Sequence, residues 1–160
     1  MAVNEQARRE ALRDFLKDNV RLRVDFSRTG QQRGLPPPPL EKPFDPAALR
    51  RDLPGRAGWK GIGKVDLADA IERRESRRDF QRAAFTLEEL AFLLWATQGV
   101  KKRFGDSCAL RTVPSAGARH AFETYVLVFA VEGLEPGVHR YLPLEHQLLF
   151  EFTESGLPRR

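Results

Sequence analysis

A long apolar helix is the feature that most constrains this chain. Thr86 and Glu89 have the spacing of a capping box, which marks the start of a helix. Gly99 is placed to end that helix. Between these signals, leucine, alanine, phenylalanine and tryptophan fall on nearly every side of the predicted helix. A helix that is apolar all round needs cover from every direction, so we expect it to lie in the centre of a core.

A strand-sized apolar run supplies a second element of that core. Residues 125–131 are continuously apolar and rich in β-branched and aromatic side chains. Such runs are typical of a central strand that is covered on both faces. Pro136 and Gly137 then turn the chain, and residues 138–142 and 147–152 are expected to form a hairpin. Helices followed by strands indicate an α+β fold with a central antiparallel sheet.

The N-terminal part of the chain has a different character. Asn4 can cap an amphipathic helix that is expected to reach about residue 19. Four consecutive prolines at 36–39 force an extended polyproline stretch. We interpret residues 20–64 as an extended arm that wraps over a partner or over its own core, with a plain linker as the alternative. The predicted division is residues 1–65 for the helix and the proline-rich arm, and residues 66–160 for the main domain.

Composition narrows the class of protein. The 160 residues suffice for one ordinary domain, and 41% hydrophobic with 31% charged residues indicates a globular chain. No apolar run approaches the length of a membrane span, and the N-terminus has no apolar signal core. Cys108 is the single cysteine, which excludes an internal disulfide and a multi-cysteine metal site. These features favour a cytoplasmic setting. The net charge of +5 favours anionic partners in general.

An arginine-rich segment is the first candidate for chemistry. Residues 73–80 read Arg-Arg-Glu-Ser-Arg-Arg-Asp-Phe and follow a helix that Asp66 can cap. Guanidinium groups and a hydroxyl within about two helical turns suit a phosphate. Arg74 and Arg78 are four residues apart, hence on one helical face if the helix continues through them. A solvated helix face is the alternative.

A tight turn is the second candidate. It consists of Pro114, Ser115, Ala116 and Gly117. A turn of this composition presents backbone N–H and C=O groups closely enough to contact the edge of a flat heterocycle. Arg111 precedes it and can reach a phosphate or a ring. A phosphate grip together with a turn against a ring edge is what a flavin mononucleotide (FMN) needs.

Taken in order, these motifs resemble the nitroreductase-like flavoprotein family. The closest branch is the SagB-type dehydrogenases, which include thiazole and oxazole (azoline) oxidases. The first motif is matched by Arg74, Ser76, Arg78 and Phe80. The second is matched by Pro114, Ser115, Ala116, Gly117, His120 and Tyr125, and the third by Gly133, Leu134, Pro136, Gly137 and Tyr141. The resemblance covers about residues 34–150.

The resemblance implies a nitroreductase-like fold and an FMN-dependent oxidoreductase that transfers hydride through the flavin. It implies FMN contacts for Arg74, Ser76, Arg78, Arg111, Pro114, Ser115, Ala116 and Gly117. The substrate would be a small molecule or an azoline peptide, with NAD(P)H as a possible donor. Family members form homodimers with the flavin at the interface. No catalytic side chain and no metal site is predicted.

Several departures from the family support a second interpretation. Glu75 lies within the arginine-rich segment, where this branch tends to have small or neutral residues. Family domains continue with further helices and another core strand, so the domain is expected to be incomplete at its C-terminal side. The alternative is therefore a non-catalytic fragment or interaction module that docks on a partner. It predicts exposed apolar surface around Leu90, Trp95 and Val126. RNA binding through residues 73–82 is disfavoured, because few aromatic residues accompany those arginines.

Overall fold

The computed structural model describes residues 4–153 and contains two compact units. The units are Met1–Pro38 and Pro39–Arg160. The predicted division between residues 65 and 66 stays a prediction about domain organisation. No helix among the described residues is both long enough and apolar enough to cross a bilayer.

The first unit begins with the predicted amphipathic helix. Helix α1 spans Glu5–Phe15, and the Asn4 side chain caps it by accepting a hydrogen bond from the Gln6 N–H at 3.0 Å. The helix is confirmed, but it ends about a turn earlier than expected. Short 3₁₀ helices at Asp18–Arg23 and Phe26–Arg28 follow it.

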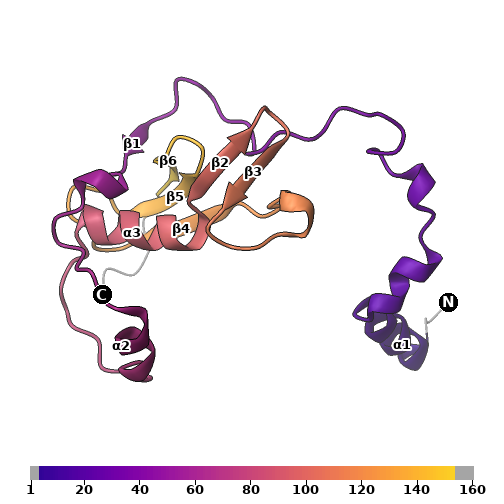
Figure 1. Ribbon diagram of the computed structural model, residues 1–160, viewed down its shortest axis with the longest axis horizontal. Helices are drawn as coiled ribbons and strands as arrows, with labels where there is room; N and C mark the ends of the chain where they lie inside the picture. Colours follow the sequence, from indigo (N-terminus) through magenta and orange to yellow (C-terminus); the bar gives the residue numbers. More distant parts are fainter. Residues whose placement is uncertain (1–3, 154–160) are drawn as a thin grey trace. The chain divides into compact units, whose positions relative to one another are not determined.

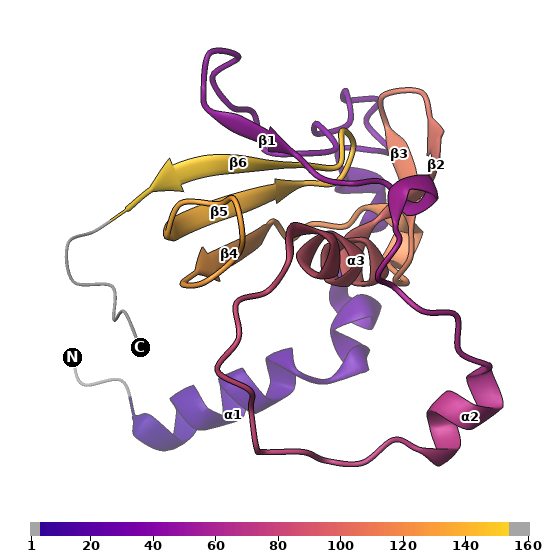
Figure 2. The same ribbon diagram turned by 90° about the vertical axis from the view of Figure 1, so that its left-hand side faces the viewer.

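A four-stranded antiparallel sheet organises the second unit (Figures 1 and 2). Its strands are β1 (Arg50–Asp52), β4 (Thr124–Val128), β5 (Gly137–Leu142) and β6 (Gln147–Phe152), in the order β1-β6-β5-β4. The predicted hairpin of β5 and β6 is confirmed, and so is the α+β class. Strand β1 was not predicted; it pairs with β6 in the register Arg50 opposite Leu149.

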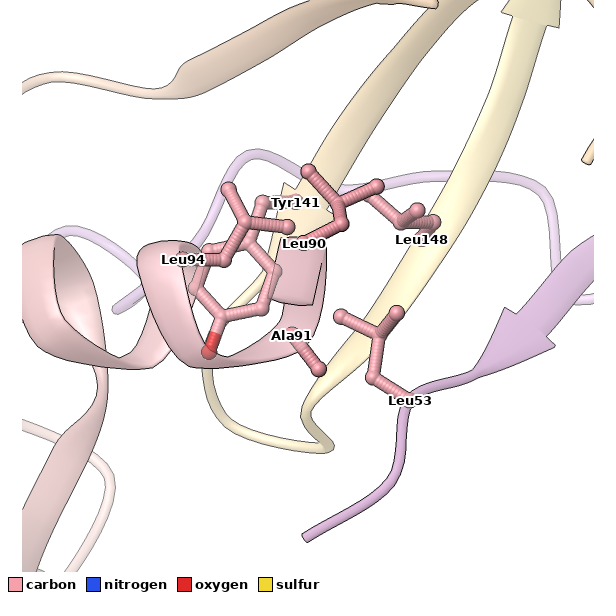
Figure 3. Close-up of a cluster of buried hydrophobic side chains, with 6 residues drawn as sticks. All are labelled: Leu53, Leu90, Ala91, Leu94, Tyr141 and Leu148. Carbon is pink, nitrogen blue, oxygen red and sulfur yellow. The ribbon is translucent and has the colours of Figure 1, made fainter. Parts of the chain in front are cut away.

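Helix α3 (Leu87–Gln98) packs on the sheet and forms the core with it (Figure 3). The capping box is present, because the Thr86 hydroxyl accepts from the Glu89 N–H and the Glu89 carboxylate accepts from the Thr86 N–H. The central side chains of the core are Leu53, Leu90, Ala91, Leu94, Tyr141 and Leu148. The segment that contains Leu53 was expected as an arm, and its residues 40–53 lie on the core of their own unit.

Two expectations about burial were wrong. Helix α3 buries only the side that carries Leu90, Ala91 and Leu94, while Leu93 is 46% exposed. Strand β4 lies at the edge of the sheet rather than at its centre, since among the described residues the sheet pairs it with β5 alone. The apolar side chains of Tyr125, Leu127 and Phe129 are consequently about half exposed on and beside it.

The remaining elements flank this core. Strands β2 (Val100–Phe104) and β3 (Cys108–Arg111) form a separate hairpin. Residues 101–106 were expected as a polar loop, and the strand there was missed because its side chains are mostly lysine and arginine. Helix α2 (Leu67–Glu72) begins as predicted, with the Asp66 carboxylate accepting from the Ala68 N–H at 2.8 Å.

Candidate functional site

The turn that follows β3 is the best-formed part of the candidate site. A 3₁₀ helix at Ala116–Ala118 occupies the predicted turn, and Gly117 has a φ of 65°. Ala118 and His120 also have positive φ, of 54° and 46°. The Ser115 hydroxyl accepts a hydrogen bond from the His120 N–H at 2.9 Å and so closes the turn. Backbone in this unusual conformation is characteristic of functional sites, because strain persists only where the surroundings enforce it.

A cavity of about 330 Å³ lies beside this turn. Its volume is at the lower end of the range for ligand sites, about 300–1,000 Å³. It is lined by Lys101, Leu110, Arg111, Thr112, Val113, Pro114, Ser115, Ala118 and His120. Two cations, two hydroxyls and an imidazole therefore line one small space. This donor set suits a ligand that carries negative charge or carbonyl oxygens.

Arg111 is the most constrained side chain of the cavity. It is 8% exposed, and it donates hydrogen bonds to the Gln98 side-chain oxygen and to the Leu40 carbonyl, both at 3.3 Å. Its Nε is buried without a partner among the described residues. A buried donor without an acceptor is costly, and such groups in native proteins are usually satisfied by a water molecule, an ion or a ligand. Burial lowers the pKa of Arg111, and the Glu41 and Glu123 carboxylates oppose that shift.

His120 lies near the positive charge of Arg111 and is itself uncharged. Burial lowers the pKa of its imidazole, and the positive charge of Arg111 lowers it further. Its ordinary pKa is 6.5, so the ring is uncharged at neutral pH. A neutral imidazole can donate one hydrogen bond and accept another, but it adds no charge to the cavity.

The arginine-rich segment is not helical, which corrects the expected shared face of Arg74 and Arg78. Helix α2 ends at Glu72, and residues 74–82 have no regular structure. Arg74, Ser76 and Arg78 are exposed. The ion pairs of this region are local, from Arg73 to Asp69 and from Arg77 to Glu75. The structure therefore brings Arg111 and the Pro114–Gly117 residues together but does not join Arg74, Ser76 and Arg78 to them.

Three residues of the site were not anticipated from the sequence. Lys101 lines the cavity from β2, Gln98 holds Arg111 from the end of α3, and Glu41 lies near Arg111 from a distant part of the chain. A buried glutamate in a proline-rich stretch carries no local signal. Among the described residues, no group of three or more histidine, cysteine, aspartate or glutamate side chains is arranged to hold a metal ion.

Comparison with known proteins gives one partial relationship. No profile of a known protein family matches the chain. The chain is 39% identical over 88 residues to a curated protein of Methanocaldococcus jannaschii named "Putative nitroreductase MJ1384". The similarity covers 55% of this chain and 42% of that relative, so the chain spans well under half of the relative's length. This similarity supports the resemblance to the nitroreductase-like family. It does not show a relationship to the SagB-type branch.

Proposed function

We propose that this protein is an FMN-dependent oxidoreductase of the nitroreductase-like family, of the SagB type. The observation that carries the proposal is the Arg111 side chain, held beside the tight turn with a buried Nε that has no acceptor among the described residues. The similarity to a protein named as a nitroreductase supports an oxidoreductase as the general kind of activity. A small molecule or an azoline peptide is the proposed substrate, NAD(P)H a possible donor, and a homodimer the proposed assembly.

The donor chemistry of the site fits FMN. Arg111, Ser115, Ala116 and Gly117 would bind the flat ring through a cation and backbone groups, with Pro114 shaping the turn. Arg74, Ser76 and Arg78 would bind the phosphate, since no other partner occupies these exposed groups among the described side-chain hydrogen bonds. Bound FMN would supply the hydride chemistry, and the protein would bind, orient and tune it.

The residues of the cavity would act on charge and orientation. Arg111 would hold a buried positive charge near the bound flavin, and such a cation would favour its negatively charged reduced form and so raise its reduction potential. Gln98 and the Leu40 carbonyl fix the direction of its guanidinium. The Ser115 hydroxyl holds the turn closed through the His120 N–H. Neutral His120 would leave Lys101 and Arg111 as the charges that a ligand meets.

A pair of arginine variants tests the phosphate contact. Arg78→Ala should weaken FMN binding by roughly 1.5–3 kcal/mol, the scale for a lost hydrogen bond to a charged group. That corresponds to about tenfold to 150-fold in dissociation constant. Titration of FMN into each protein, followed by flavin fluorescence, measures the effect.

Arg82→Ala is the matched control, because Arg82 is exposed in the same irregular segment but lies outside the family motif. Its affinity for FMN should stay close to that of the wild type. A general basic field would respond about equally to either loss. Equal effects at the two positions would therefore exclude a specific contact by Arg78.

A specific observation also favours the second candidate, a module that docks on a partner. An apolar cavity of about 370 Å³ lies between α3 and β4. It is lined by Ala83, Phe85, Leu90, Leu93, Val126, Leu127, Val128, Phe129, Ala130 and Val131. The sequence predicted exposed apolar surface around Leu90 and Val126. Leu90 is buried and Val126 is half-buried, so the exposed apolar side chains lie next to these two residues. A continuous apolar groove of this kind marks an interaction surface.

The module hypothesis predicts concentration-dependent self-association and binding of a dye for exposed apolar surface. Leu127→Lys should weaken such association by about 0.7–1.5 kcal/mol, roughly half the value of one fully buried leucine, because about half of Leu127 is already out of water. Leu110→Lys on β3 is the control, because Leu110 is similarly exposed but lies outside the groove. Sedimentation and dye fluorescence give the two readings. A wild-type monomer that binds no dye would contradict the hypothesis.

A further inference from the structure

A cavity of about 240 Å³ lies where β1, β5 and β6 meet the segment before β5. It is lined by Leu49, Arg50, Arg51, Gly133, Leu134, Glu135, His139, Leu148 and Phe150. None of these residues lines the cavity beside the tight turn or the groove beside β4. The second unit therefore has a separate small cavity, here called the β1 cavity, that the candidate functional site does not use.

The strand register explains why these side chains meet. Arg51 lies opposite Leu148, and His139 lies opposite Phe150. Residues that are directly opposite share a face of the sheet, and so do alternate residues of one strand such as Leu148 and Phe150. Leu148 belongs to the core beneath α3, so all four side chains are on the face of the sheet that carries this helix. The β1 cavity is thus a lateral extension of the core.

The size and lining of the β1 cavity suit one small ring. Leucine side chains and the Phe150 ring form much of its wall. An apolar protein cavity of about 150 Å³ is large enough to bind benzene, so this cavity has room for a substituted ring. The His139 and Phe150 rings already form an edge-to-face pair, with centroids 5.3 Å apart and planes at 70°. A third aromatic ring could pack against them in the same manner.

His139 gives the wall one specific polar group. The residue is 4% exposed, and its Nε2 lies 2.9 Å from the Glu135 carbonyl oxygen. A carbonyl oxygen can only accept, so Nε2 carries the proton of this bond. Among the described ion pairs none involves His139, and a buried ring without a counter-charge is favoured in its neutral form. In this neutral tautomer Nδ1 is a hydrogen-bond acceptor.

The Nδ1 atom of His139 is buried and has no donor among the described residues. A buried acceptor without a donor is costly, and in native proteins such groups are usually satisfied by a water molecule, an ion or a ligand. Leu134 and Phe150, which share the wall with His139, are only half-buried, so they can shift when a molecule enters. An acceptor at an otherwise apolar wall selects a molecule that is itself apolar except for one donor.

We propose that the β1 cavity binds a small phenol-like molecule, an aromatic ring with one hydroxyl group, whose hydroxyl donates a hydrogen bond to His139 Nδ1. Arg51 favours an aromatic ring over an aliphatic alcohol of the same size. A Cβ placed on Gly133 would lie 3.7 Å from the Arg51 Nη2, so the guanidinium lies against this wall. A cation in that position attracts the face of an aromatic ring.

A bound ring would contact β1, β6 and the segment before β5 at the same time. It would therefore fasten β1 to the β5–β6 hairpin. A ligand that binds only the folded protein raises its stability by mass action, so the melting temperature should rise with phenol concentration. The inference holds whether or not the protein binds a flavin.

Titration of phenol and of toluene into the full-length protein, followed by NMR, tests the site. Toluene has the same ring, with a methyl group in place of the hydroxyl. Both molecules should shift the signals of Leu134, Leu148 and Phe150. Phenol alone should shift the nitrogen resonance of His139 Nδ1, because only its hydroxyl can donate to that atom. No binding of phenol at millimolar concentration, or shifts confined to the groove beside β4, would overturn the proposal.

His139→Phe keeps an aromatic ring at this position and removes the acceptor. Its affinity for phenol should fall about threefold to tenfold, the scale of one neutral hydrogen bond, while its affinity for toluene should change little. The variant also loses the bond to the Glu135 carbonyl, and the toluene titration reports any change of the cavity that results. Equal losses for phenol and toluene would show that Nδ1 does not select the ligand and would overturn the proposal.

A second variant keeps the test decisive if His139→Phe folds poorly. Leu49 lines the β1 cavity but is 67% exposed, so Leu49→Trp crowds the cavity without overpacking the core. It should weaken the binding of both phenol and toluene. Leu67→Trp is the matched control, because Leu67 on α2 is 73% exposed and lines none of the cavities described above. Equal affinities in the two variants would exclude this cavity as the binding site.

The outcome does not depend on the proposed oxidoreductase function. No flavin enters these measurements, and the β1 cavity shares no residue with the cavity beside the tight turn. Their failure would therefore leave the proposed function to its own test.

Discussion

Replacement of Arg140 by alanine should lower the free energy of unfolding by about 2–4 kcal/mol, because it removes a fully buried side chain and a charged hydrogen-bond donor. The Arg140 side chain is 1% exposed, and its Nε lies 3.0 Å from the Glu151 carboxylate, an ion pair rather than an aligned hydrogen bond. It also donates to the Lys42 carbonyl at 3.0 Å. Alanine removes these contacts and leaves Glu151 without its cation. Urea denaturation followed by circular dichroism measures the loss.

Arg50→Ala is the matched control for this variant. The Arg50 guanidinium lies over the same Phe44 ring, at 5.5 Å from its centroid, but the residue is exposed on β1. Its replacement should change stability by no more than about 0.5 kcal/mol, as is usual for surface positions. Similar losses for both arginines would mean that the burial of Arg140 and its contacts to Lys42 and Glu151 are not what stabilises the hairpin.

The second large effect is expected at Leu148. Its side chain is completely buried between the sheet and α3, in contact with the cluster that contains Leu53 and Tyr141 (Figure 3). Leu148→Ala removes apolar contacts and leaves a cavity, which together cost about 2–5 kcal/mol. Thermal and urea unfolding of the variant give the value.

Leu110→Ala provides the comparison, because Leu110 lies in the β2–β3 hairpin and is 41% exposed. Its loss should cost less, since about two fifths of its surface stays in contact with water in the folded protein. A cost at Leu148 as small as that at Leu110 would contradict the assignment of the core to the α3–sheet interface.

Elements with strong local signals were predicted well from the sequence. The capping box at Thr86 and the cap at Asp66 each act within a few residues, so the sequence pattern is sufficient. The turn expected at Pro136–Gly137 lies instead at residues 132–133, and Gly137 is the first residue of β5. The helices and the β5–β6 hairpin at these signals are confirmed. The tight turn at Ala116–Ala118 belongs to the same class.

Features that depend on distant partners were not predictable in this way. The three residues of β1 are Arg, Arg and Asp, which have no strand preference; pairing with β6 makes them a strand. The apolar run at β4 suggested a central strand, but whether a strand lies at the centre or the edge depends on what pairs with it. The exposed groove beside β4 is the result.

The candidate site also contains residues with a local sequence signal and residues that depend on distant partners. Arg111 and the turn are close in sequence, and the structure brings them together in one cavity. The contributions of Glu41 and Gln98 come from other elements and have no motif. The expected helical face of Arg74 and Arg78 depended on α2 continuing, and α2 ends at Glu72. Their role in binding a phosphate stays a prediction.

The pairing of β1 with β6 has a consequence for how the protein is made. The ribosome adds about 5–20 residues per second and releases the chain from its N-terminal end. Residue 50 is therefore synthesised several seconds before its partner Leu149. During that interval β1 and Leu53 have no hairpin on which to dock. The first-made strand of this sheet must be among the last to join it, and the loop that closes then is nearly a hundred residues long.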